Sequence, residues 1–138
     1  MSLFVDTGVF FAAYSKNDVH HCDAVELMEW GMHGKGGVIY TSDYIFDETV
    51  TLARVKTHNS EVPIQIGRMI KESPRIKLLK VDENVFNMAW DIFKIYCQKG
   101  LSFTDCTSIA IIKSHKIDTI FSFDAHFDGI INKMSNLS

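Results

Sequence analysis

The sequence is poor in cysteine and proline, with three cysteines and two prolines among 138 residues. Cys22, Cys97 and Cys106 are odd in number and share no C-x-x-C spacing, which argues against a disulfide framework. We therefore expect buried thiols in a reducing compartment and a cytoplasmic protein. Pro63 and Pro74 both stand in short polar stretches, where we expect breaks between secondary-structure elements.

The sequence also lacks an excess of positive charge. It has 14 lysines and arginines against 17 aspartates and glutamates, for a formal net charge of −3. A protein of this balance has no general attraction to nucleic acid, so a polyanion would have to be held locally. Long hydrophobic runs are missing as well, because Asp6 interrupts the first apolar stretch. We expect neither a signal peptide nor a membrane span, and no membrane partner.

No nucleotide-binding loop is present. The "GKGG" at 34–37 lacks the G-x-x-x-x-G-K-[ST] spacing of a phosphate loop, and no G-x-G-x-x-G occurs, so a nucleotide cofactor is not expected. The "HHCD" at 20–23 contains residue types that bind zinc. Consecutive helical residues point in different directions, however, so this stretch is a poor zinc site.

The chain does contain enough apolar residues for a folded core, since 46% of it is hydrophobic, and we expect residues 1–138 to form a single domain. Short apolar runs alternate with stretches of helical periodicity. This alternation predicts an α/β fold, with three α/β/α layers around a central, mainly parallel sheet. The expected strands are 3–5, 38–41, 76–81 and 119–123, and the expected helices are 18–33, 43–58, 64–71, 82–99 and 103–116.

Two acids follow predicted strands directly. Asp6 comes after the first strand, and Asp124 comes after the last one in "DTIFSFD". The carboxyl ends of parallel strands share one edge of the sheet, where ligands commonly bind. If the two strands are neighbours, both carboxylates face the same crevice.

Two further acids interrupt apolar stripes of predicted helices. Glu48 lies in line with Ile45 and Leu52, and Asp105 lies in line with Ile109 at helical spacing. A charge on a core-facing stripe is costly unless it is paired. No lysine or arginine lies on the inward stripe within one turn of Glu48, so a cation from solvent is the simplest partner.

Each acid also has an explanation that requires no ligand. Asp105 completes an S-x-x-D capping box with Ser102. Asp6 and Asp124 are each placed to cap a helix that begins directly after them. Glu48 could extend its carboxylate to solvent at the edge of the stripe. A single shared site explains the four acids together, whereas these alternatives treat them as independent.

Four carboxylates without clustered histidine or cysteine favour a hard cation, Mg²⁺ or Mn²⁺. Such ions activate water and stabilise the leaving oxygen in phosphodiester hydrolysis. The residues therefore predict a metal-dependent nuclease.

The chain also resembles the PIN-domain ribonucleases, including the VapC-type toxins of toxin–antitoxin pairs. The resemblance covers nearly the whole chain and rests on four motifs in the family's order: "FVDTGVFFA", "DYIFDETVTL", "LSFTDCTSIAI" and "IFSFDAHF". It implies a PIN-like fold and RNA as the substrate. It further implies Mg²⁺ or Mn²⁺ bound by the catalytic residues Asp6, Glu48, Asp105 and Asp124. Thr7 and Ser122 are implied as accompanying cofactor-site residues, with Ser122 standing where the family often has threonine.

Two other functions are weighed against this one. An aspartyl-phosphate phosphohydrolase needs a second aspartate two residues after the first, and Gly8 occupies that position. A non-catalytic RNA-binding or scaffold module of the same fold would typically have lost one or more of the acids. As partners we expect RNA, an antitoxin protein, and a second copy of the chain bound through apolar surfaces of the helices that start near Asp18 and Ile64.

Overall fold

The computed structural model describes residues 1–138 and contains one five-stranded sheet. Every strand pair is parallel, in the order β3-β2-β1-β4-β5. The strands are β1 (Ser2–Val5), β2 (Val38–Ser42), β3 (Ile76–Leu79), β4 (Thr119–Phe121) and β5 (Lys133–Met134). The helices are α1 (Thr7–Tyr14), α2 (His21–Met32), α3 (Asp43–Thr57), α4 (Glu61–Glu72), α5 (Glu83–Tyr96) and α6 (Phe103–Ser114), with the 3-10 turns η1 (Cys97–Lys99) and η2 (Ala125–Phe127).

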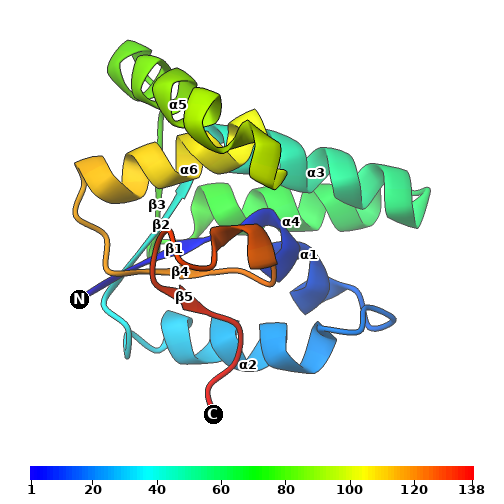
Figure 1. Ribbon diagram of the computed structural model, residues 1–138. Helices are drawn as coiled ribbons and strands as arrows, with labels where there is room; N and C mark the ends of the chain where they lie inside the picture. The colour runs from blue at the N-terminus through cyan, green and yellow to red at the C-terminus, as the bar shows by residue number, and fades with distance from the viewer.

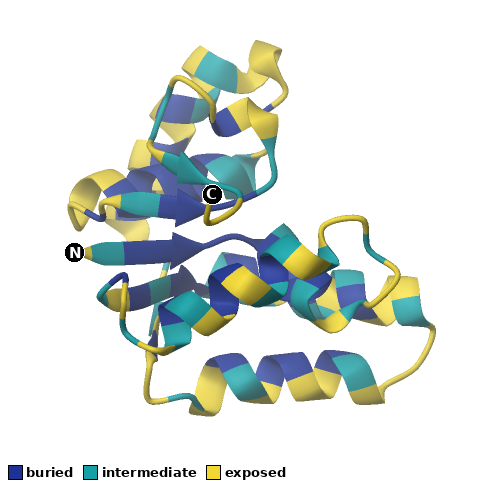
Figure 2. Cartoon of the chain, turned by 90° about the horizontal axis from the view of Figure 1, so that it is seen from below, coloured by how far each residue is buried: buried dark blue, intermediate teal, exposed yellow.

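Helices cover both faces of the sheet, so the predicted three-layer α/β/α arrangement with a parallel sheet is confirmed (Figure 1). On one face α2 packs against the strands, with Gly31 facing the side chains of Leu3, Ile39 and Phe121. On the other face lies α6, with α5 stacked on its outer side. Figure 2 shows that buried residues concentrate in the strands and on the inward sides of the helices.

The central strand β1 lies in the middle of the apolar core. Leu3, Phe4 and Val5 are completely buried, as a strand covered on both faces requires. They belong to one cluster of 29 buried apolar residues. No helix of the structure is both long enough and apolar enough to cross a membrane.

Several boundaries differ from the sequence expectations. The two-residue strand β5 was not predicted, because so short a segment has no periodicity. Helix α4 begins at Glu61 rather than Ile64, with Pro63 inside its first turn. Proline is tolerated there because the first-turn N–H groups have no partner within the helix.

The cysteine prediction was wrong for two of the three residues. Only Cys106 is buried, whereas Cys22 and Cys97 are exposed. All three are free thiols. Cys106 lies in α6, whose residues 106–112 are all buried between the sheet and α5.

Candidate active site

A cavity of about 500 Å³ lies where β1 and β4 end. All four acids identified in the sequence contribute to its wall. Its lining residues are Asp6, Thr7, Gly8, Glu48, Leu52, Ser102, Asp105, Phe123 and Asp124. Gly8 lies in this wall at the position where an aspartyl-phosphate enzyme would carry its second aspartate.

Asp6 is the most buried of the acids, with 7% of its surface exposed. It follows β1 and is the N-cap of α1. Its Oδ1 accepts a hydrogen bond of 2.9 Å from the Thr7 N–H, and its Oδ2 accepts one of 2.7 Å from the Ser122 hydroxyl. Both carboxylate oxygens are therefore held in place from the protein side.

The Thr7 residue links Asp6 to Glu48. Its backbone N–H binds Asp6, while its hydroxyl donates to Glu48 Oε1 at 2.6 Å. Glu48 lies on α3, which begins at the N-cap Ser42 directly after β2. The neighbouring Asp47 is exposed, as its position on the polar side of the helix predicts. Thr7 thus fixes the orientation of a glutamate that is 41 residues away in sequence.

Ser122 makes the second link, between Asp6 and Asp124. Its hydroxyl donates to Asp6 and accepts a hydrogen bond of 3.0 Å from the Asp124 N–H. Ser122 is completely buried, and it follows β4, which pairs with β1 in the register Val5↔Phe121. The neighbouring positions of these two strands bring together residues 116 apart in sequence.

Asp105 approaches the cavity from the first turn of α6. It forms the capping box expected from the sequence: its Oδ2 accepts from the Ser102 N–H at 2.9 Å, and the Ser102 hydroxyl accepts from the Asp105 N–H at 3.0 Å. Asp124 in turn caps η2 through the His126 N–H. Capping and a shared cavity are thus compatible, because a cap uses only part of the acceptor capacity of a carboxylate.

The electrostatics of the cavity favour a bound cation. The pKa of Asp6 is raised to about 7: burial and, to a lesser extent, the negative charges of Asp105 and Glu48 raise it, while the Ser122 and Thr7 hydrogen bonds lower it. Burial also raises the pKa of Asp105, and the Asp124 charge contributes in the same direction. No lysine or arginine is among the lining residues, so the protein itself supplies no strong counter-charge.

The donor set fits a divalent metal. The carboxylates of Asp105 and Asp124 and the imidazole of His126 place one donor atom each within 4.8 Å of one another. Asp6 and Glu48 add oxygen donors to the same cavity. Carboxylate-rich sites of this kind suit Mg²⁺ and Mn²⁺.

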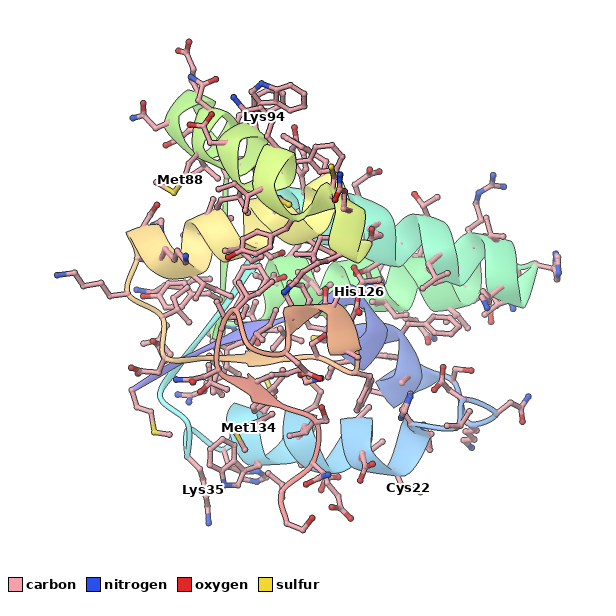
Figure 3. The ribbon with its side chains drawn as sticks, viewed as in Figure 1. Cys22, Lys35, Met88, Lys94, His126 and Met134 are labelled. Atoms are coloured by element: carbon pink, nitrogen blue, oxygen red, sulfur yellow. The ribbon has the colours of Figure 1, made fainter.

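His126 was missed by the sequence analysis. Its signal in the sequence is its position two residues after Asp124, within the short η2 turn. The histidine Nδ1 lies 2.9 Å from Asp124 Oδ1. Figure 3 shows His126 on η2, the turn that follows β4 and lies beneath α6.

Comparison with known proteins identifies the family to which this chain belongs. Residues 3–132 match the PIN domain family, which is 130 residues of the 138-residue chain. The chain belongs to the PIN domain family. All four acidic residues of the cavity lie within the matched PIN domain, as do Thr7, Ser122 and His126.

Individual relatives point to one group within the PIN domain family. The chain is 33% identical over 129 residues to a VapC ribonuclease of Archaeoglobus fulgidus, covering 92% of this chain and 80% of the relative. It is 28% identical over 126 residues to the 23S rRNA-specific endonuclease VapC20 of Mycobacterium tuberculosis, covering 91% of each.

Solved structures of similar fold include a VapC toxin and a toxin–antitoxin complex. The crystal structure of VapC20, described as a sarcin–ricin loop cleaving toxin, superimposes with a TM-score of 0.78 at 26% identity over 91% of this chain and 92% of the other. A toxin–antitoxin complex from Klebsiella pneumoniae has a chain with a TM-score of 0.67 at 14% identity, covering 98% of this chain and 97% of that one. The latter likeness concerns the fold alone.

Proposed function

We propose that this PIN domain is a metal-dependent ribonuclease of the VapC type, with Asp6, Glu48, Asp105 and Asp124 as its metal-binding and catalytic residues. The observation that carries the proposal is that all four carboxylates line one cavity without a lysine or arginine among its lining residues. The Thr7 and Ser122 hydroxyls hydrogen-bond to Glu48 and Asp6 in that cavity. The identity to the VapC ribonuclease of Archaeoglobus fulgidus supports RNA as the substrate.

The chain's own residues supply binding and orientation. Asp105 and Asp124 are close enough to share one cation. Burial raises the pKa of Asp6 to about 7, and a cation beside this carboxylate would favour its ionised form. Thr7 and Ser122 hydrogen-bond to the carboxylates of Asp6 and Glu48, so we assign them as positioning residues. A bound Mg²⁺ or Mn²⁺ would supply Lewis acidity toward a phosphate oxygen and a lowered pKa for water.

The proposal predicts that RNA cleavage requires a divalent cation. Purified protein is expected to cleave RNA with Mg²⁺ or Mn²⁺ and to lose this activity completely in EDTA, because the four carboxylates repel both one another and the phosphate when no cation is bound. Ribosomal RNA is a reasonable first substrate, given the relative that acts on 23S rRNA. Full cleavage in EDTA, or cleavage with Zn²⁺ alone, would contradict the proposal.

A second prediction concerns the Thr7 hydroxyl. Thr7→Val keeps the shape of the side chain but removes the 2.6 Å hydrogen bond to Glu48. We expect RNA cleavage to fall by about 10–100-fold, the usual effect of losing an outer-shell partner of a metal ligand, while Thr7→Ser retains most activity. Initial cleavage rates at saturating Mg²⁺ measure the effect; equal rates for Thr7→Val and wild type would show that Thr7 does not position Glu48.

Partners and location extend the same proposal. We propose that residues 1–138 act as one nuclease domain in the cytoplasm, where RNA and a reducing environment for the free thiols are both found. An antitoxin is the expected protein partner, since VapC20 is described as a toxin and a structural neighbour is a toxin–antitoxin complex. Self-association stays a prediction; Ile64 on α4, with 54% of its surface exposed, lies on one of the surfaces expected to take part.

A further inference from the structure

The imidazole of His126 lies beside the carboxylates of Asp105 and Asp124. His126 Nδ1 lies 2.9 Å from Asp124 Oδ1, and one ring nitrogen of His126 belongs with Asp105 and Asp124 to a group of three donor atoms within 4.8 Å of one another. Donor atoms this close together would need only small side-chain rotations to contact one cation.

One edge of the His126 ring packs against the backbone at Gly100. A Cβ atom at Gly100 would lie 2.8 Å from His126 Nε2, so the Nε2 edge of the ring rests against this glycine. Gly100 has a φ of 92°, which other residues rarely adopt. With Nε2 packed against Gly100, Nδ1 is the ring nitrogen that lies next to the Asp124 carboxylate.

The amine of Lys133 is engaged by other groups on the same segment. Lys133 Nζ bonds to Asp128 Oδ1 at 2.7 Å and to the Asp124 carbonyl at 3.2 Å. The His126 side chain is 49% exposed, so the ring has room to adjust toward an ion.

We propose that His126 is a nitrogen ligand of the metal centre, which makes the centre selective for Mn²⁺ over Mg²⁺. The inference rests on the proposed function and deepens it by naming the cation. Mg²⁺ prefers oxygen ligands and keeps its water, whereas imidazole suits transition metals. A donor set of Asp105, Asp124 and His126 therefore adds affinity for Mn²⁺ that an all-carboxylate site would not have.

The test is pulsed electron paramagnetic resonance of protein loaded with Mn²⁺ alone, together with calorimetry of Mn²⁺ and Mg²⁺ binding. Wild type is expected to show the nitrogen modulation of a coordinated imidazole, and His126→Gln to lack it. His126→Gln is also expected to lower the Mn²⁺ affinity by about tenfold or more and to change the Mg²⁺ affinity little. Because His126 lies at the surface, circular dichroism should show an unchanged fold.

His20→Gln is the matched control. The His20 ring stacks on Phe123 at 4.2 Å, and Phe123 lines the cavity, so this histidine is close to the site but outside the donor group. The nitrogen modulation must persist in His20→Gln. If wild type binds Mn²⁺ and cleaves RNA without nitrogen modulation, or if the modulation survives in His126→Gln, this inference is wrong while the proposed function stands. If wild type binds neither cation, both are wrong.

Discussion

Asp6→Asn and Glu48→Gln are each expected to reduce RNA cleavage by at least about 100-fold, more than the loss of an outer-shell partner alone. Both substitutions preserve side-chain size and remove one negative charge from the cavity. Asn at position 6 can still accept from the Thr7 N–H, so α1 keeps its cap. The loss therefore reflects the metal site rather than the fold, and single-turnover cleavage at saturating Mn²⁺ or Mg²⁺ measures it.

Asp47→Asn provides the control for this prediction. Asp47 precedes Glu48 on α3 but is exposed and does not line the cavity. We expect Asp47→Asn to cleave RNA at the wild-type rate. Activity that survives in Asp6→Asn, or that falls equally in Asp47→Asn and Glu48→Gln, would show that the cavity acids do not act as proposed.

Without divalent metal, the wild-type protein is expected to lose stability as the pH rises toward 7. The folded-state pKa of Asp6 is about 7, raised mainly by burial above the ordinary value of 3.8 for an aspartate. The folded state therefore binds this proton more tightly than the unfolded state does. The stabilisation is fully present below about pH 4 and is lost as the pH rises through about 7. This change corresponds to the difference between pKa values of 3.8 and about 7, on the order of 4 kcal/mol.

Asp6→Asn isolates this contribution, since the amide does not titrate. In metal-free buffer at pH 8, the variant is expected to have a higher free energy of unfolding than wild type. Added Mg²⁺ should raise the melting temperature of wild type more than that of the variant, because the cation stabilises the ionised carboxylates. Urea unfolding at pH 5 and pH 8, with and without Mg²⁺, measures both effects. If the variant is less stable than wild type at pH 8, Asp6 acts only as the N-cap of α1.

Some features of the molecule follow from local sequence alone. The alternation of apolar runs and helical periodicity predicted four of the five strands and the layered α/β/α fold. Local pattern also identified the capping box of Ser102 and Asp105, because both partners lie within one helical turn. The separation of Glu48 from Asp47 followed from helical geometry in the same way, since adjacent residues point about 100° apart around the helix axis.

Other features depend on contacts between distant segments. The pairing of β1 with β4 places Ser122 against Asp6, and no local pattern encodes which strands become neighbours. The burial that raises the pKa of Asp6 to about 7 likewise arises from the surrounding elements. The same holds for His126, whose ring packs against Gly100. The sequence by itself determined which acids stand at the ends of the strands and helices, because those positions follow from periodicity. Only the tertiary structure decided which groups hydrogen-bond to these acids and how their pKa values are shifted, because hydrogen bonds and desolvation depend on three-dimensional proximity.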